Sequence, residues 1–120
     1  MGRLTTHVLD TANGRPAAGV RVRVYALGPD VQHDRRLLRD VTTNADGRCN
    51  APLLEGEALA PGRYEMVFGA GAYFAALGVA QPRPPFLEDV VLRFGIADAE
   101  QHYHVPLLVS PWSYSTYRGS

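Results

Sequence analysis

Short segments of alternating apolar and polar residues recur along this chain, and this pattern constrains its fold more than any other feature. The most regular segment is VRVRVYAL, residues 20–27. Successive side chains of a β-strand point to opposite faces, so a period of two predicts a strand with one buried face and one solvent-exposed (wet) face. The buried face would carry Val20, Val22 and Val24, and the wet face Arg21, Arg23 and Tyr25.

Similar segments, separated by turn residues, predict a sheet protein. Strands are expected at 3–10, 35–44, 62–69, 86–94, 102–110 and 113–120, with a short one inside 45–54. Asn13-Gly14 and Asp46-Gly47 favour turns, and QPRPPF favours a connector. Only AGAYFAAL, residues 70–77 before Gly78, favours a helix. The chain is therefore predicted to be all-β, an antiparallel β-sandwich of seven or eight strands with one short helix.

Composition excludes several classes of protein. With 120 residues the chain suits a single domain spanning 1–120, and its 12 basic and 12 acidic side chains leave no surplus for binding nucleic acid. No apolar run is long enough to cross a bilayer, and the start of the chain has no apolar targeting segment. The single Cys49 favours a reducing compartment. We expect a soluble cytoplasmic protein that binds neither nucleic acid nor membrane.

Histidines gather on one predicted face near the end of the chain. In QHYHVPLLVS the strand period puts His102, His104, Pro106 and Leu108 on one face, with Tyr103, Val105, Leu107 and Val109 on the core face. A tight turn at 110–113 would return the last strand alongside, with His104 opposite Gly119 and Pro106 opposite Tyr117. The same parity places His7 on one face with Thr5 and Leu9.

Three hypotheses for these residues stay open on the pattern alone. Histidines beside an arginine could run hydrolysis, with imidazole as general base and guanidinium stabilising an oxyanion. His102 and His104 could instead hold zinc with His7, although no Cys or acidic residue at ligand spacing supports a metal site. An apolar-lined face with Thr, Ser and Tyr could also simply bind a small molecule or a partner sheet.

Several stretches together resemble the transthyretin-related family, in its 5-hydroxyisourate hydrolase branch. They are LTTHVLDTANGRPAAGVRVRVY, TNADGR, GRYEMVF, YFAALG and HYHVPLLVSPWSYSTYRGS, and they cover essentially the whole chain. The final Tyr117-Arg118-Gly119-Ser120 is similar to the signature that separates the hydrolases from the hormone carrier. The resemblance implies a transthyretin-like sandwich of two four-stranded sheets with one short helix. It also implies a homotetramer whose central channel is lined by the first, seventh and eighth strands, so that two subunits build each site.

The resemblance further implies an activity and its residues. The family's two histidines and one arginine fall on His7, His104 and Arg48, which would be catalytic without a cofactor or metal. The substrate would be the purine-derived 5-hydroxyisourate, whose six-membered ring is opened by water during urate degradation. Substrate contacts would come from the chain end and from the channel-facing proline, namely Tyr117, Arg118, Gly119, Ser120 and Pro106.

Some features are left outside this assignment. The stretch PPFLEDVVLRF departs from the family pattern, and we interpret the difference as loop variation. His33 and His102 match no functional position and are expected to face solvent or to support other residues. The alternative function is a transthyretin-like carrier that binds a hydrophobic small molecule without turnover; the retained histidines favour the enzyme.

Overall fold

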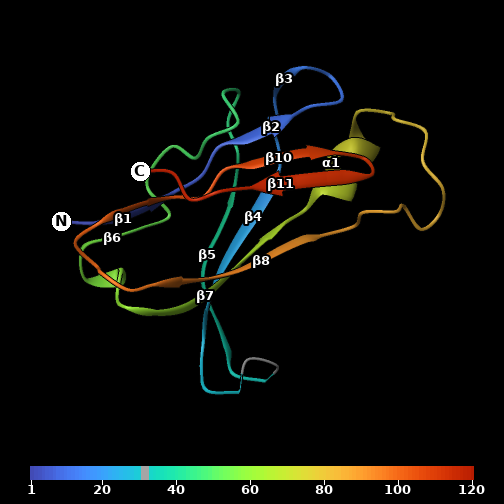
Figure 1. Ribbon diagram of the computed structural model, residues 1–120. Helices are drawn as coiled ribbons and strands as arrows, with labels where there is room; N and C mark the ends of the chain where they lie inside the picture. The colour runs from blue at the N-terminus through green and yellow to red at the C-terminus, as the bar shows by residue number, and fades with distance from the viewer. Residues whose placement is uncertain (31–32) are drawn as a thin grey trace.

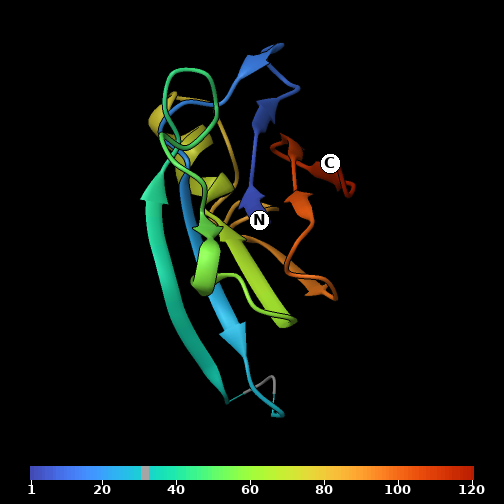
Figure 2. The ribbon, with the colours of Figure 1, turned by 90° about the vertical axis from the view of Figure 1, so that its left-hand side faces the viewer.

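The computed structural model describes residues 1–30 and 33–120, which form two packed layers of strands (Figures 1 and 2). One layer is a four-stranded antiparallel sheet in the order β5-β4-β7-β8. Its strands are β4 (Arg21–Leu27), β5 (Arg35–Thr42), β7 (Gly62–Phe68) and β8 (Val90–Ile96). The predicted β-sandwich is therefore confirmed, although β8 begins four residues later than the sequence pattern indicates.

The second layer consists of two short sheets in line, ordered β6-β1-β9 and β11-β10-β2-β3. Its strands are β1 (Arg3–Thr5), β2 (Val8–Asp10), β3 (Arg15–Pro16), β6 (Leu54–Glu55), β9 (His102–His104), β10 (Leu107–Ser110) and β11 (Ser113–Thr116). Between the two sheets the pairing continues: the backbone N–H groups of Val105 and Leu107 donate to the carbonyls of Thr5 and His7, at 2.9 Å each. Each predicted strand, 3–10 and 102–110, is thus one path with a short interruption.

The pairing between these two paths is parallel rather than antiparallel. β1 pairs with β9 and β2 with β10 in parallel register, so Thr5 lies opposite His104. Alternation reports which face a side chain occupies but not the direction of the neighbouring strand, so the sequence pattern could not reveal this. The parallel register is what brings the start and the end of the chain together.

The core lies between the layers and follows the predicted parity. Val20, Val22 and Val24 are at most 1% exposed, and the predicted core face of 103–109 is buried throughout. Tyr25 contradicts the prediction of a wet face, since it is only 8% exposed. A bulge follows Val24, and the Arg35 guanidinium covers the Tyr25 ring at 4.0 Å, so an arginine shields the aromatic ring from water.

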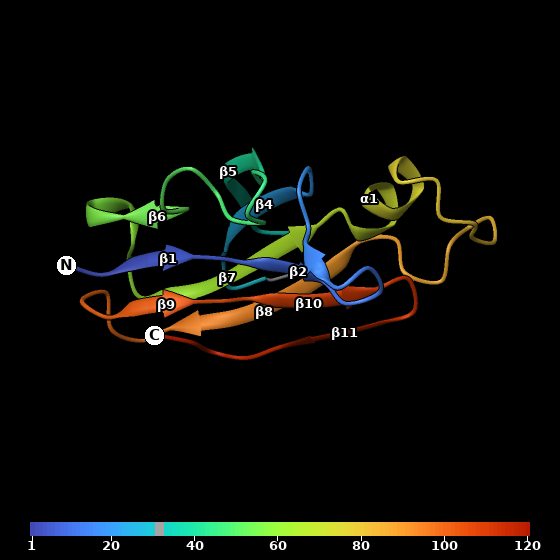
Figure 3. The ribbon, with the colours of Figure 1, turned by 90° about the horizontal axis from the view of Figure 1, so that it is seen from above.

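The predicted helix is confirmed as α1 (Ala70–Ala76), at the end of the sandwich opposite both chain termini (Figure 3). Gly78 follows the C-cap Leu77, and its φ of +79° suits glycine. The Tyr73 hydroxyl donates to the Asp10 carboxylate at 2.7 Å, and burial together with this bond raises the pKa of Tyr73 to about 12. Within the described residues no helix is long and apolar enough to cross a membrane.

The segment 45–54, predicted to contain a short strand, is mostly loop. Only β6 at its end is a strand, and a 3₁₀ turn, η1 (Gly56–Ala58), follows it. The predicted turn is confirmed, because Gly47 has a φ of +73°. A Cβ at Gly47 would lie 2.4 Å from the Val8 carbonyl oxygen, so only glycine lets this loop approach β2 so closely.

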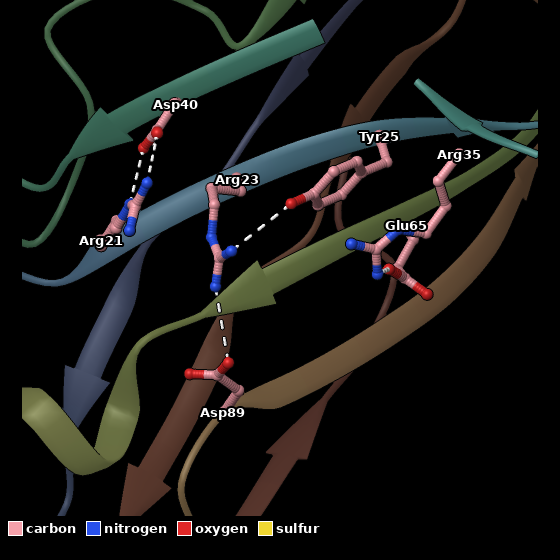
Figure 4. Close-up of polar contacts among 7 residues, drawn as sticks. All are labelled: Arg21, Arg23, Tyr25, Arg35, Asp40, Glu65 and Asp89. Carbon is pink, nitrogen blue, oxygen red and sulfur yellow. Dashed lines mark hydrogen bonds and ion pairs between the residues drawn. The ribbon is translucent and has the colours of Figure 1, made fainter. Parts of the chain in front are cut away.

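Arginine–carboxylate pairs cover the outer face of the β5-β4-β7-β8 sheet (Figure 4). Glu65 is 1% exposed and accepts hydrogen bonds from Arg35 at 2.8 Å and Arg93 at 2.9 Å. On the same face Arg21 pairs with Asp40, and Arg23 pairs with Asp89. These pairs compensate the charge on this face of the molecule.

Candidate active site

A cavity of about 480 Å³ opens on the second layer, at the end where both chain termini lie. Its polar lining comes from β1 and the residue after it, β9, the 43–53 loop and the chain end: Arg3, Thr5, Thr6, Arg48, Asn50, His102, His104 and Ser120. The strand register explains the gathering, because Arg3 and Thr5 lie opposite His102 and His104. Predicted site residues that are far apart in sequence therefore meet in one cavity.

His104 is held by its ring and by its backbone. Its Nδ1 lies 2.8 Å from the Thr5 hydroxyl, and its backbone pairs with Gly119 through two hydrogen bonds. The predicted pairing of His104 with Gly119 is confirmed. A Cβ at Gly119 would lie 3.1 Å from Cδ2 of His104, so glycine lets the last strand pass against the imidazole ring.

His7 lies in the interruption between β1 and β2, beside Arg48. The two residues form an isolated antiparallel bridge, and Nε2 of His7 lies 2.9 Å from the backbone carbonyl of Asp46. A carbonyl oxygen can only accept, so Nε2 of His7 donates. This bond fixes the neutral ring with its proton on Nε2 and its lone pair on Nδ1. His7 itself is not among the side chains that line the cavity.

Arg48 is presented by a loop that Asn44 organises. The Asn44 side-chain oxygen accepts from the backbone N–H groups of Asp46 at 2.9 Å and Arg48 at 3.2 Å, and its amide donates to Asn50. Such side-chain bonds replace ladder bonds in a turn, which is why this segment is a loop. In residues 1–30 and 33–120 no carboxylate pairs with the Arg48 guanidinium.

The electrostatics of the site favour neutral histidines. Partial burial lowers the pKa of His104 below its ordinary value, and the charges of Arg48, His102 and His7 lower it further. Burial and Arg48 likewise lower the pKa of His7, against the opposing effect of the Asp46 carbonyl. No acidic side chain of the described chain lines the cavity. The site therefore combines the uncharged imidazoles of His7 and His104 with two cations, Arg3 and Arg48, that suit an anionic or electron-rich ligand.

The other predicted substrate contacts lie elsewhere in the single chain. Tyr117 and Arg118 line a second cavity, of about 420 Å³, with residues of β8, and the Arg118 guanidinium stacks 4.4 Å from the Tyr103 ring centre. Arg118 also donates to the Gln101 side chain at 2.8 Å. Pro106 is buried and accepts from the Thr116 hydroxyl through its carbonyl. Only Gly119 and Ser120 of the predicted contacts lie against the histidine cavity.

The two remaining histidines have different surroundings. His33 is largely exposed and pairs with Asp30 at 2.7 Å, away from the cavity. His102 supports the site, because its Nε2 lies 2.8 Å from the Thr5 hydroxyl. Within the described residues no three His, Cys, Asp or Glu side chains are placed to hold a metal ion together.

Comparison with known proteins agrees with the fold. Residues 4–119 match the HIUase/Transthyretin family. The chain belongs to this family. The curated 5-hydroxyisourate hydrolase 2 of Rhizobium meliloti is 62% identical over 99% of this chain and 97% of its own length.

Two solved structures represent the two branches of the family. A Klebsiella pneumoniae 5-hydroxyisourate hydrolase has a TM-score of 0.81 at 36% identity, covering all of both chains. Sea bream transthyretin in complex with thyroxine has a TM-score of 0.86 at 27% identity, covering 98% of this chain and 94% of its own. The backbone is thus shared with hydrolases and carrier alike, while sequence identity is higher with the hydrolases.

Sequence reasoning missed two contributors to the site. It placed Thr5 on the face of His7 without a role, yet its hydroxyl contacts both His102 and His104. It also overlooked Arg3, which lies opposite His102 and lines the cavity. Parity along 3–10 puts both on that face, so a parallel alignment of this strand with 102–110 would have found them.

Proposed function

We propose that this chain is an enzyme that hydrolyses 5-hydroxyisourate, with His7, Arg48 and His104 as its catalytic residues. One observation carries the assignment of the site: His104 and Arg48, which has no carboxylate partner among the described residues, line one cavity beside His7, in a chain 62% identical to a named hydrolase. The substrate is a compact, planar, electron-rich ring. A polar cavity with cationic and imidazole groups suits such a molecule.

The reaction opens the six-membered ring at an acyl C–N bond. A histidine removes a proton from water while the water oxygen attacks the ring carbonyl carbon, and an oxyanion develops on the carbonyl oxygen. The C–N bond then breaks, the carbonyl re-forms as a carboxylic acid, and the departing ring nitrogen receives a proton. The product is a ureidoimidazoline carboxylate.

The electrostatics described above support these roles. A general base must be unprotonated at the working pH, and the lowered pKa values of His7 and His104 keep both rings neutral near pH 7. The Arg48 guanidinium has no carboxylate partner among the described residues, so its charge is available to the substrate and its oxyanion. An arginine already paired with a carboxylate would contribute less.

The active form in this proposal is a homotetramer with sites between subunits. Relatives in the family support an oligomer, and Tyr117 is 61% exposed in the single chain, as a residue that completes a neighbouring subunit's site would be. The exposed Tyr117 and Arg118 then contact substrate across the interface, with Gly119 and Ser120 closing the site from within the chain, while the buried Pro106 supports this wall from behind. Light scattering coupled to size exclusion tests the stoichiometry; a monomer with full activity would refute the shared site.

The carrier alternative has one specific observation in its favour, the similarity to sea bream transthyretin in complex with thyroxine. The polar lining of the histidine cavity favours the hydrolase instead. Titration with thyroxine and an assay of turnover separate the two functions, since a carrier binds thyroxine without accelerating the hydrolysis.

The decisive experiment generates 5-hydroxyisourate from urate with uricase and follows its ultraviolet decay with and without the protein. Decay no faster than the spontaneous reaction would refute the proposed function. If decay accelerates, His7→Ala and His104→Ala should each remove most of the activity while the circular dichroism spectrum stays unchanged. His33→Ala is the matched control, because this histidine lies outside the cavity and should keep wild-type activity.

A further inference from the structure

One hydroxyl joins two histidines in the candidate cavity. Thr5 Oγ1 lies 2.8 Å from Nδ1 of His104 and 2.8 Å from Nε2 of His102. The three side chains share a face because Thr5 pairs with His104 in the parallel ladder and His102 precedes His104 by one strand period. The contact therefore connects the first strand of the chain to a catalytic residue on β9.

The chemistry of a hydroxyl couples the two rings. Threonine has one hydrogen to donate, so Oγ1 can donate to only one of the two imidazole nitrogens. The other nitrogen must carry a proton and donate it to Oγ1. Within the described residues the Thr5 hydroxyl has no other acceptor, and a hydroxyl that accepted from both rings would leave its own hydrogen unused. Two arrangements use that hydrogen: either His104 donates from Nδ1 and His102 accepts at Nε2, or both bonds run in the opposite direction. The tautomer of one neutral ring thus sets the tautomer of the other.

The surroundings of His104 favour the first arrangement. With the proton on Nδ1, Nε2 carries a lone pair, and no hydrogen bond within the described residues occupies that atom. Arg48 is the permanent cation among the groups that act on this ring, and no described acidic side chain lines the cavity. Positive charge attracts a lone pair and repels an N–H dipole.

We propose that Thr5, backed by His102, is a positioning residue that holds His104 as the Nδ1–H tautomer with its Nε2 lone pair free for water. This inference rests on the proposed hydrolysis and assigns water activation to His104. When Nε2 takes the proton from water, Nδ1–H remains bonded to Thr5 and the hydroxyl remains bonded to His102. The ring therefore keeps its orientation throughout the step, as an imidazole base requires.

The tautomer can be measured without any substrate, by NMR of protein labelled with ¹⁵N at histidine, above the titration range of the rings. In the wild type the two nitrogens of His104 should show protonated Nδ1 and unprotonated Nε2. Thr5→Val keeps the side-chain shape and removes the bridge, so the signals should shift toward a mixture of tautomers, and kcat should fall about tenfold with little change in KM. Thr5→Ser should restore both.

A second variant gives a sharper result. His102→Ala removes the acceptor, which frees the hydroxyl to donate to Nδ1, so His104 should move to the Nε2–H tautomer and kcat should fall. Thr11→Val is the matched control, since it removes a hydroxyl bonded only to the Val109 carbonyl, away from the cavity. It should leave the His104 signals and kcat unchanged.

Two results would overturn the inference: a wild-type His104 protonated on Nε2, or Thr5→Val and His102→Ala with wild-type tautomer and kcat. The tautomers in both results can be measured without any substrate. If the wild type failed to accelerate 5-hydroxyisourate decay, the proposed function would fall while the spectra still decided the positioning role. A normal wild-type rate with unchanged variants would remove the positioning role alone.

Discussion

Arginines lie both on the outer face of the β5-β4-β7-β8 sheet and around the histidine cavity. They are paired with carboxylates in the first region, whereas Arg48 in the second has no such partner among the described residues. On the outer face Glu65 accepts from both Arg35 and Arg93. On the same face Arg21 pairs with Asp40 (Figure 4). On the cavity face Arg48 has no described carboxylate partner and lies beside histidines whose pKa values are lowered. Paired charge contributes to the stability of the fold, whereas unpaired charge is available for chemistry.

Removal of Arg48 should have the largest effect on activity and so gives the strongest test of the difference between the two regions. Arg48→Ala should lower kcat/KM by about a hundredfold to a thousandfold, the range typical for loss of an oxyanion-stabilising group, with little change in thermal stability. The assay is uricase-coupled decay of 5-hydroxyisourate, with a melting curve for each variant. Arg21→Ala is the matched control, because it removes an exposed arginine that is already paired. Equal losses in both variants would show that the two faces do not differ.

Removal of the arginines that pair with Glu65 on the outer face should instead affect stability. The double variant Arg35→Ala, Arg93→Ala leaves the buried Glu65 carboxylate without a cation and should lower the free energy of unfolding by about 3 kcal/mol. Glu65→Gln should cost less, because the two released arginines are already 42% and 51% exposed and can be hydrated. Urea unfolding measures both, and activity below the unfolding transition should stay near wild type. A larger loss in Glu65→Gln would contradict this account.

Titration of the cavity face sharpens the comparison. Burial is the largest cause of the lowered pKa of His104, and the charge of Arg48 is the second. Activity should therefore fall on the acid side of the pH profile at a pH below the ordinary histidine pKa of 6.5. In Arg48→Met the pKa of His104 should rise toward 6.5, as followed by NMR of the imidazole C–H. Since the unfolded chain binds protons more readily in this window, stability should decrease as the pH falls through 6.5 toward the folded-state pKa. An unchanged pKa in Arg48→Met would show that Arg48 does not act on His104 and would leave burial and the two neighbouring histidines as the causes.

Much of this contrast could be predicted from the sequence. Alternation placed His104 and the buried valines on the correct faces because the strand period is fixed by backbone geometry. The tight turn at 110–113 set the register that brings Gly119 to His104, which the structure confirms. The roles of His7, Arg48 and His104 came from the family resemblance and remain a proposal.

The rest depended on contacts that periodicity does not encode. The parallel pairing of β1 with β9 places Thr5 against His104, and strand direction leaves no mark in an alternating pattern. Tyr25 was expected to be exposed because it alternates with Arg21 and Arg23 on the polar face of its strand. The sequence pattern cannot reveal that the Arg35 guanidinium lies over the Tyr25 ring. Tyr117 and Arg118 line a separate cavity in the single chain, away from the histidines. The sequence could not reveal this, because alternation does not show which side of an edge strand a partner subunit would cover.

Gly119→Ala should have the smallest effect, and it tests how closely the chain end approaches the His104 ring. The added Cβ would lie 3.1 Å and 3.2 Å from Cδ2 and Cβ of His104, a tight contact that displaces the imidazole by a few tenths of an ångström. Because base catalysis depends on orientation, kcat should fall about threefold to tenfold while the unfolding transition barely moves. Gly95→Ala is the control, since its Cβ would meet only the Gly62 carbonyl oxygen at 4.0 Å. Wild-type kcat in Gly119→Ala would mean that the ring tolerates displacement and that the close approach serves packing alone.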